Sequence, residues 1–425
     1  CPICDQAGEC DLQDYWLEHQ RSPKRMPDEP IHKPKAIVFG DTIVYDAERC
    51  IMCTRCIRVC DEVASDPVLD MRQRGNRNEI VVAPGRKLDH NYSLMTEHVC
   101  PVGALTSSHF RFKARVWFLR SERTVCQGCA TGCNAYLDYD PRDNKPYRYR
   151  PRDNEAVNGY WMCDEGMLSY PAAYEGRLSH ALVGGDDATI EDALAAAKEQ
   201  LLGHEADPSR IAVVLSAEHS NEDNFALAMV ASRYLGVKEV YLAGRPAGEA
   251  DDVLMHADKN PNRAGAQAVA AKLDLGTPKS LAALLDALRA DVYDYVLSLG
   301  SHVDVEAPAE LKSELARVKG HIAICTHEGC LSHASHVAFP ASSWAEARGT
   351  YVNAKGIAQQ ADVVLQPIGE SYPGWQLVTA LARALGYDID WTSREDLEQA
   401  MLQDSAPTVL GAVDSTVETA PEAGA

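Results

Sequence analysis

The second half of the chain alternates short apolar runs with segments of helical periodicity. Buried strands are predicted where β-branched residues and other apolar residues follow one another, at residues 211–216, 238–242, 293–299 and 321–325. Helices are predicted between them at residues 224–235, 280–290 and 309–318. This alternation is typical of an α/β domain with a doubly wound parallel sheet. No G-x-G-x-x-G motif follows a predicted strand, so the pattern does not indicate a dinucleotide site.

The alternation begins only near residue 181, and the composition changes at the same point. Residues 1–180 contain 12 of the 14 cysteines, with 24 basic and 26 acidic residues. The remaining 245 residues contain 17 basic and 36 acidic residues, so most of the net charge of −21 belongs to them. An acidic chain of this kind argues against nucleic-acid binding. No run of about 18 apolar residues predicts a membrane-spanning helix.

A C-x2-C-x2-C-x3-C run, the spacing of bacterial ferredoxins, begins at Cys50. In such runs the fourth cluster ligand is usually a distant cysteine that precedes proline. The last cysteine of the run, Cys60, precedes aspartate, whereas Cys100 precedes proline. We therefore assign one [4Fe–4S] cluster to Cys50, Cys53, Cys56 and Cys100. Cys60 is interpreted as a buried thiol nearby, although it could instead complete another cluster.

Two further cysteine groups have the spacing of metal ligands. A C-x2-C-x3-C run followed thirty residues later by a lone cysteine gives a complete set: Cys126, Cys129, Cys133 and Cys163. The first group has only three members, Cys1, Cys4 and Cys10, and its fourth ligand is either upstream or a histidine such as His19. Disulfides are disfavoured because nothing indicates secretion. Zinc is the alternative at each of these two groups alone, and the neighbouring ferredoxin run favours iron.

Other polar candidates are interpreted as structural. Cys325 and Cys330 lack further thiols nearby, and His327, His333 and His336 lack an ordered ligand spacing. Six basic residues near the cysteine runs either form a solvated face or offset negative clusters and raise their potentials: Arg55, Arg58, Arg111, Lys113, Arg115 and Arg120.

Residues 1–13, 50–60, 100–106 and 111–117 resemble the large iron–sulfur subunit of bacterial NADH:quinone oxidoreductase, respiratory complex I. The resemblance continues through Cys163 and, more weakly, to residues 339–353, which are similar to the end of a molybdopterin-oxidoreductase domain. It implies α+β iron–sulfur domains followed by an α/β domain. The expected divisions are a remnant His/Cys3 [4Fe–4S] domain (1–40), a ferredoxin-like [4Fe–4S] domain (41–120), a [4Fe–4S] domain of the molybdenum/tungsten type (121–180), a molybdopterin-oxidoreductase-like domain (181–405) and a disordered tail (406–425).

The resemblance also implies particular ligands. In the family a [2Fe–2S] domain and the histidine ligand of the first [4Fe–4S] cluster precede the position of Cys1. We therefore expect a fragment that lacks both, with Cys1, Cys4 and Cys10 as an incomplete set and His19 not a ligand. The set that includes Cys163 matches a cluster that only some bacterial members keep, off the main electron path. Cys60 matches no family ligand.

The function implied is electron relay through [4Fe–4S] clusters, from a flavin-bearing, NADH-oxidising subunit toward quinone. The chain itself would have no NADH or quinone site. Its expected partners are that subunit and the other peripheral-arm iron–sulfur subunits, with no nucleic acid and with membrane contact only through the complex. The expected location is the cytoplasmic face of the bacterial inner membrane.

Two alternatives remain open. One is an active molybdopterin oxidoreductase of the formate-dehydrogenase type, and the other is a zinc-stapled scaffold. Relatives of the second half hold molybdenum through a cysteine or selenocysteine after an early strand. The comparable residues 241–248 contain no thiol, so we expect no molybdopterin and a domain that serves as a scaffold.

Overall fold

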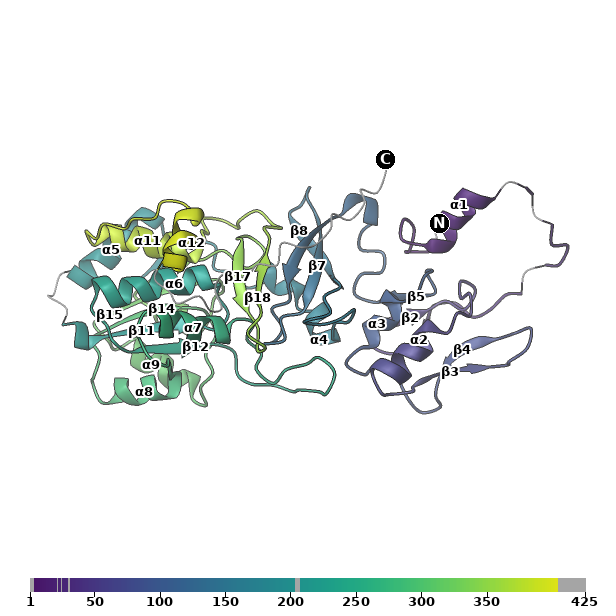
Figure 1. The fold of residues 1–425 in the computed structure, drawn as a ribbon, viewed down its shortest axis with the longest axis horizontal. Coiled ribbons are helices and arrows are strands. Elements are labelled where there is room, and N and C mark those ends of the chain that lie inside the picture. The colour runs from purple at the N-terminus through teal and green to yellow at the C-terminus, as the bar shows by residue number, and fades with distance from the viewer. Residues whose placement is uncertain (1–3, 21, 24, 30, 203–206, 404–425) are drawn as a thin grey trace. The chain divides into compact units, whose positions relative to one another are not determined.

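The computed structural model describes residues 4–403, apart from residues 21, 24, 30 and 203–206. Cys1 and the predicted tail at 406–425 therefore lie outside the described residues. Contacts divide the chain into two units (Figure 1). The first comprises residues 1–129, 133–175 and 249–257, and the second comprises residues 130–132, 176–248 and 258–425.

The first unit is built from short antiparallel strands (Figure 1). One sheet has the order β1-β2-β5, one has the order β6-β7-β8, and β3 pairs with β4 as a hairpin. Their bounds are β1 (Ile37–Val38), β2 (Ile43–Tyr45), β3 (Leu69–Arg72), β4 (Glu79–Val82), β5 (Leu105–Ser107), β6 (Arg120–Val125), β7 (Asn134–Asp140) and β8 (Lys145–Pro151). The cysteine motifs occupy the connections between these elements.

The helices of the first unit are also short. They are α1 (Asp11–His19), α2 (Arg55–Arg58), α3 (Ser93–His98) and α4 (Asp164–Met167), with a π-helical turn at Val59–Val63 and 3-10 turns at Val116–Phe118 and Tyr170–Ala173. Asp164 caps α3, because its carboxylate accepts hydrogen bonds from the amides of Ser93 (3.0 Å) and Leu94 (2.9 Å). Helix α3 then leads directly to Cys100. Asp164, which follows Cys163, thus fixes the helix that precedes Cys100.

The second unit contains an eight-stranded sheet with the order β10-β9-β16-β15-β14-β11-β12-β13. Neighbouring strands from β16 to β13 are parallel, and β9 pairs antiparallel with both β16 and the edge strand β10. A separate hairpin pairs β17 with β18. The bounds are β9 (Ala181–Val183), β10 (Asp186–Ala188), β11 (Ile211–Ser216), β12 (Val240–Ala243), β13 (Lys279–Ser280), β14 (Tyr295–Leu299), β15 (Gly320–Cys325), β16 (Val337–Pro340), β17 (Gly349–Val352) and β18 (Ala358–Ala361).

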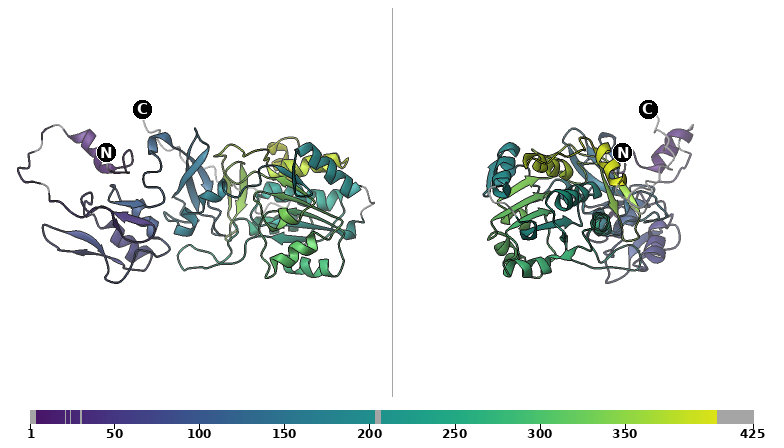
Figure 2. Two further views of the ribbon diagram at one scale, coloured as in Figure 1. Left: turned by 180° about the vertical axis from the view of Figure 1, so that it is seen from behind. Right: turned by 60° about the vertical axis from the view of Figure 1, so that its left-hand side comes forward.

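Helices cover both faces of this sheet (Figure 2). Alternate residues of β11 divide between two apolar clusters, with Val213 and Leu215 in one and Ala212 and Val214 in the other. The first cluster includes side chains of α5 (Ile190–Leu202), α6 (Asn221–Met229), α7 (Arg263–Lys272), α11 (Gly374–Ala384) and α12 (Arg394–Gln403). The second includes side chains of α8 (Leu281–Arg289), α9 (Pro308–Leu315) and α10 (Cys330–Ala334). The predicted α/β, doubly wound architecture is confirmed, with an antiparallel edge that the periodicity did not predict.

Differences from the predicted elements are at their ends. The helix expected at 224–235 begins at Asn221, because the Ser220 hydroxyl accepts a hydrogen bond from the Asp223 amide (3.2 Å) and caps the first turn. Its last turn widens into a π-helix at Val230–Tyr234. The strand expected at 211–216 has those bounds in the structure.

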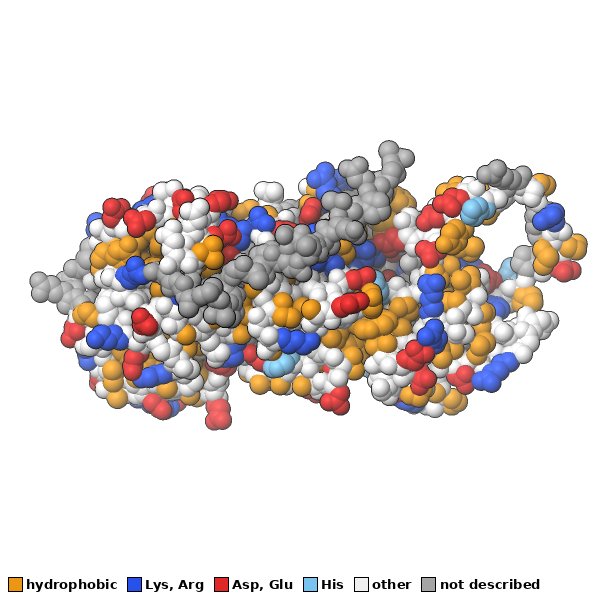
Figure 3. Space-filling model, in the orientation of Figure 1, with side chains coloured by type: hydrophobic (Ala, Val, Ile, Leu, Met, Phe, Trp, Pro, Cys, Tyr) orange, Lys and Arg blue, Asp and Glu red, His pale blue; other side chains and the backbone are white. Residues whose placement is uncertain are grey.

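Charged side chains of both signs are scattered over the visible face of the second unit rather than gathered into one patch (Figure 3). No helix within the described ranges is both long and apolar enough to cross a membrane.

Candidate metal centres

The four cysteines predicted as one ligand set line a single cavity in the first unit. Cys50, Cys53, Cys56 and Cys100 surround it together with apolar residues that include Ile80 and Leu105. The first two lie in the loop before α2, the third lies in α2, and Cys100 follows α3. Segments almost fifty residues apart in the sequence therefore supply one thiol-lined space.

The loop that carries the first three of these thiols has an unusual backbone. Met52 and Thr54 have φ angles of 58° and 64°, in the left-handed region that non-glycine residues rarely occupy. They alternate with the cysteines, and the amide of Met52 donates to Cys50 Sγ (3.4 Å). Strained residues of this kind concentrate at functional sites. The left-handed residues turn the chain so that successive thiols face the same cavity.

The raised pKa values of thiols in this cavity favour metal coordination over a group of free thiolates. Burial raises the pKa of Cys100 to about 11, although nearby backbone amides oppose the shift. Burial, and then the charges of Cys100 and Cys50, raise the pKa of Cys56 further still. Cys56 is buried, Cys50 and Cys100 are half-buried, and Cys53 is exposed. Four neighbouring thiolates repel one another unless positive charge lies between them, and metal coordination deprotonates thiols outright. The donor set therefore fits an iron–sulfur cluster.

The third predicted set also comes together, at one end of the β6–β7 pair. Cys126 follows β6, Cys133 precedes β7, and the amide of Cys126 donates to the carbonyl of Cys133 (2.8 Å). Cys163 caps α4, where its sulfur accepts a hydrogen bond from the Gly166 amide (3.3 Å). All four thiols of the set, including Cys129, are buried. Burial raises the pKa of Cys133, and the charges of the other three thiols raise it further.

Glycine leaves room for the sulfurs of this set. A Cβ on Gly166 would lie 3.0 Å from Cys126 Sγ and 3.4 Å from Cys163 Sγ. A Cβ on Gly128 would lie 3.4 Å from Cys126 Sγ and 3.3 Å from Gly166 Cα. A side chain at Gly166 would therefore crowd the sulfur of Cys126, and the close approach of backbone to thiols is as expected where a loop wraps a cluster.

The first set is described only in part, since Cys1 lies outside the described residues. Cys4 is buried, and its sulfur packs so closely on Gly103 that a Cβ there would overlap it. Cys10 is half-buried at the start of α1, and the amide of Asp11 donates to the carbonyl of Pro101 (3.0 Å). The first set thus borders the segment that supplies Cys100.

The thiols of the second and third sets are neighbours rather than a closed shell around one point. In the described part of the chain, no three His, Cys, Asp or Glu side chains converge closely enough to hold a metal ion as they stand. In a [4Fe–4S] cluster each thiolate binds a different iron atom.

Comparison with known proteins places these motifs in a family context. The model of the ferredoxin-like domain of NADH-quinone oxidoreductase subunit 3 matches residues 40–106. The molybdopterin oxidoreductase model matches residues 260–384. A NADH-quinone oxidoreductase subunit of Mycobacterium bovis is 33% identical over 262 residues, which are 59% of this chain and 32% of that protein.

The chain is homologous to a subunit of NADH-quinone oxidoreductase. Subunit 3 of the Thermus thermophilus enzyme is 32% identical over 267 residues, or 59% of this chain and 33% of that protein. The mitochondrial iron-sulfur protein 1 of NADH dehydrogenase [ubiquinone] from Solanum tuberosum is 31% identical over 296 residues, or 68% of this chain and 39% of that protein. The resemblance predicted from the cysteine motifs is confirmed. The chain spans about a third of the length of the first curated relatives it matches.

The match to the subunit 3 ferredoxin-like domain includes the whole second cysteine set, from Cys50 to Cys100. A ferredoxin-like domain of this family implies iron–sulfur clusters. The match also includes Cys60, which the structure places outside the thiol-lined cavity. Cys60 is fully buried in the π-helical turn, with its sulfur 3.4 Å from His90 Nε2. Burial, and then the charge of Asp66, raise the pKa of its thiol to about 12.

The remaining histidine and cysteine candidates are dispersed. His336 accepts a hydrogen bond from the amide of His321 (3.0 Å), His327 contacts Thr326, and His333 is exposed. Cys325 is buried in β15 and Cys330 begins α10. His19 is exposed in the last turn of α1.

Among the predicted basic residues, two have acidic partners. Arg58 pairs with Glu62 (2.8 Å), and Arg115 pairs with Asp5 (3.2 Å). Arg115 also donates to the carbonyl of Cys4 (3.2 Å). The charge of these two arginines is therefore partly balanced within the chain.

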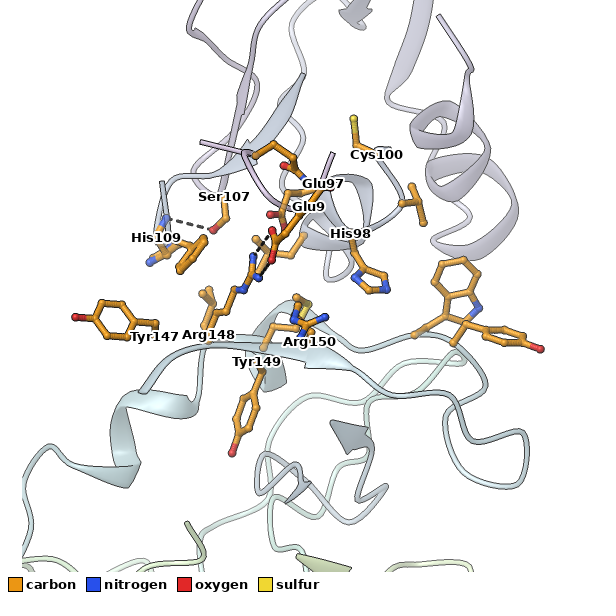
Figure 4. A pocket seen from close by; sticks show the side chains of 18 of the residues that line it. Glu9, Glu97, His98, Cys100, Ser107, His109, Tyr147, Arg148, Tyr149 and Arg150 are labelled. Atoms are coloured by element: carbon orange, nitrogen blue, oxygen red, sulfur yellow. Dashed lines mark hydrogen bonds and ion pairs between the residues drawn. The ribbon is translucent and has the colours of Figure 1, made fainter. Parts of the chain in front are cut away.

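A larger cavity of about 470 Å³ lies beside Cys100 in the first unit (Figure 4). The sulfur of Cys100 points away from the arginines of this cavity. Arg148 forms ion pairs with Glu9 and with Asp138 (2.7 Å), and Arg150 also pairs with Asp138 (2.8 Å). This cluster was not predicted from the sequence, although arginine and tyrosine alternate along β8.

In the second unit, the loop after β12 is filled by side chains of the chain itself. A Cβ on Gly244 would lie 2.6 Å from Asn260 Oδ1, and one on Gly248 would lie 2.5 Å from the Lys259 side chain. The amide of Arg245 donates to Asn260 Oδ1 (2.7 Å). Residues 241–248 therefore offer no sulfur ligand and little space, so the residues present do not fit a molybdenum centre at this loop.

Proposed function

We propose that the chain is an electron-transfer subunit of NADH:quinone oxidoreductase, which relays electrons from the flavin-bearing subunit toward quinone. The observation that carries this proposal is the cavity lined by Cys50, Cys53, Cys56 and Cys100, within a match to the ferredoxin-like domain of subunit 3. When bound there, a [4Fe–4S] cluster supplies one-electron transfer. Because the chain covers about a third of its first curated relatives, the activity of the whole subunit is part of the proposal.

The residues of the chain would tune this transfer rather than perform it. Four thiolates would hold the iron, and backbone amides such as that of Met52 donate hydrogen bonds to sulfur. Hydrogen bonds to ligand sulfurs and exclusion of water are the means by which proteins set cluster potentials. Apolar Ile80 and Leu105 cover part of the same space, whereas Cys53 is exposed to solvent.

The other two sets extend the proposed chain of redox centres. Cys126, Cys129, Cys133 and Cys163 would hold a second complete [4Fe–4S] cluster, off the main electron path. Cys1, Cys4 and Cys10 would supply three ligands of an incomplete site. The first set lies next to residues 100–103, which also supply Cys100 to the second set. This proximity supports electron transfer between clusters held by the two sets.

The partners follow from the proposed role. The chain would bind the flavin- and NADH-binding subunit and other peripheral-arm iron–sulfur subunits. It would act at the cytoplasmic face of the bacterial inner membrane and contact the membrane only through the complex. The relatives are named as subunits of NADH-quinone oxidoreductase, which supports assembly with other subunits.

Metal analysis and one matched pair of variants test this proposal. The anaerobically reconstituted 425-residue chain is expected to contain iron and sulfide in equal amounts, about eight of each for two complete sets. Cys53→Ala should abolish one electron paramagnetic resonance (EPR) signal, whereas Cys60→Ala, which alters a thiol outside the cavity, should keep both. Zinc in place of iron, or loss of a signal in Cys60→Ala alone, would contradict the assignment.

The match to molybdopterin oxidoreductase over residues 260–384 favours a second candidate, an active molybdopterin enzyme of the formate-dehydrogenase type. The absence of a thiol in residues 241–248 opposes it. Bound molybdenum or tungsten together with formate-dependent dye reduction would support this candidate over the relay.

A further inference from the structure

The backbone between two proposed ligands of the third set belongs to the second unit. Residues 130–132 lie between Cys129 and Cys133, yet their contacts assign them to the unit that contains the molybdopterin-oxidoreductase-like fold. The amide of Ala130 donates to the carbonyl of Asp258 (2.8 Å), and the carbonyl of Ala130 accepts from the amide of Ala354 (2.8 Å). Backbone hydrogen bonds therefore secure the start of this short segment.

Two buried side chains secure the rest of it. Asn353 Nδ2 donates to the carbonyl of Thr131 (3.1 Å), and Gln359 Nε2 donates to the carbonyl of Gly132 (2.9 Å). Both side chains come from the β17–β18 hairpin, where Asn353 directly follows β17 and Gln359 lies within β18. Asn353 is 1% exposed and Gln359 is 8% exposed. Amide groups buried this deeply require hydrogen-bond partners, so the geometry is specified rather than incidental.

The hairpin side chains bind residues 131 and 132, which lie between the two ligand cysteines Cys129 and Cys133. Gly132 has a φ of 60°, in the left-handed region, and Cys133 follows it immediately. The carbonyl groups of Thr131 and Gly132 cannot rotate without breaking the bonds to Asn353 and Gln359. Rotation of the Gly132 peptide would also move Cys133, which follows it directly.

We propose that Asn353 and Gln359 are positioning residues for the cluster held by Cys126, Cys129, Cys133 and Cys163. This inference rests on the proposed third-set cluster. The hairpin would fix the ligand loop through its hydrogen bonds to residues 131 and 132, with no cofactor of its own. The side chains touch backbone carbonyls rather than sulfur, so they act through Cys129 and Cys133.

Isosteric variants of the hairpin test the inference in the full 425-residue chain. Gln359→Glu keeps the size of the side chain and replaces the donor that faces Gly132 with an acceptor. Gln360→Glu introduces the same charge on the same strand and is the matched control, since residues 359 and 360 point to opposite faces of β18. Asn353→Asp keeps the Oδ1 acceptor for the amides of Lys355 and Ile357 (3.0 Å each) and removes only the donor to Thr131.

The readouts concern the cluster and not enzyme activity. The third-set EPR signal is defined as the signal that Cys133→Ser removes. In Gln359→Glu and Asn353→Asp we expect the third-set cluster to lose iron to a chelator about tenfold faster, because a buried hydrogen bond is replaced by repulsion. We also expect a shift in its midpoint potential, whereas the signal that depends on Cys53 should not change. Rates and potentials equal to those of Gln360→Glu would overturn the inference.

Two outcomes of these measurements distinguish failure of the third-set cluster from failure of the positioning role. If the wild-type chain shows no signal that depends on Cys133, the proposed third-set cluster is wrong, and the positioning role fails with it. If that signal is present and the hairpin variants leave it unchanged, only the positioning role fails. Gln359→Met, a neutral variant of similar size, replaces Gln359→Glu if the charged variant does not fold, and the same faster iron loss is expected.

Discussion

At the scale of single residues, the segment from Cys100 to Leu105 contacts the loops of two cysteine sets. Cys100 lines one thiol cavity, and the sulfur of Cys4 packs against Gly103. A Cβ on Gly103 would also lie 2.9 Å from Gln6 Cβ. Only glycine therefore lets the loops of the first and second sets approach each other.

Gly103→Ala should disturb both sets at once. The added methyl group overlaps Cys4 Sγ, and overpacking of this kind costs about 1–3 kcal/mol of the free energy of unfolding. We expect that loss in denaturant unfolding, together with a changed EPR signal for the cluster that Cys100 holds. Gly75→Ala is the control, because nothing lies within 4 Å of a Cβ at Gly75. Identical unfolding midpoints for the two variants would contradict the proposed packing.

The functional residues that could be predicted from sequence are those that belong to a short, recognisable motif. The spacing of Cys50, Cys53 and Cys56 carries its own signal, and proline after Cys100 identified the fourth thiol of the cavity. Asn353 could not be found in this way. It contacts a carbonyl 222 residues earlier in the chain, and a single buried asparagine after a strand has no distinctive pattern.

At the scale of elements, the sheet of the second unit reverses its strand order between β11 and β14. Glu218 follows β11 and His302 follows β14, so the two side chains meet at the carboxyl ends of adjacent parallel strands (3.0 Å). The periodicity predicted both strands but not this pair, because the alternation of apolar and polar residues along the chain does not determine the order of strands in a sheet. Element ends were missed for a related reason, since caps such as Ser220 depend on a single hydroxyl group.

The Glu218–His302 pair predicts a pH-dependent contribution to stability. Its hydrogen bond to Glu218 raises the pKa of His302 above 6.5. Burial acts to raise the pKa of Glu218, but His302 and Arg245 outweigh it and lower that pKa to about 2. The pair therefore contributes fully between pH 4.5 and 6.5, and the contribution is lost as the pH rises through the folded-state pKa of His302 or falls toward that of Glu218.

A double-mutant cycle with His302→Gln and Glu218→Gln measures this contribution. Because the His302 side chain is 48% exposed, solvent screening limits the coupling to about 1 kcal/mol or less. We expect the coupling free energy from denaturant unfolding to be larger at about pH 5.5 than at about pH 8.5, where histidine is neutral. Equal coupling at the two pH values would refute the charged pair.

At the scale of the whole molecule, the chain passes between its two units at five points, after residues 129, 132, 175, 248 and 257. The excursion at 249–257 returns to the first unit, where Asp251 accepts hydrogen bonds from the Tyr92 hydroxyl (2.8 Å) and from the amides of Val253 and Leu254 (2.9 Å each). Tyr92 directly precedes α3, the helix that leads to Cys100. Sequence periodicity divided the chain near residue 181 and could not show that a later segment rejoins the first unit.

Asp251→Ala should release this segment from the first unit. Removal of the carboxylate leaves the Tyr92 hydroxyl and several backbone amides without their acceptor, and each unsatisfied buried group costs about 1–3 kcal/mol. We expect amide hydrogen exchange at residues 253–255 to accelerate at least about tenfold. Asp252→Ala removes an equal charge from an exposed neighbour and should leave this exchange unchanged. Equal protection in the two variants would show that Asp251 does not secure the segment, whereas faster exchange in Asp251→Ala alone would establish that Asp251 holds residues 249–257 on the first unit.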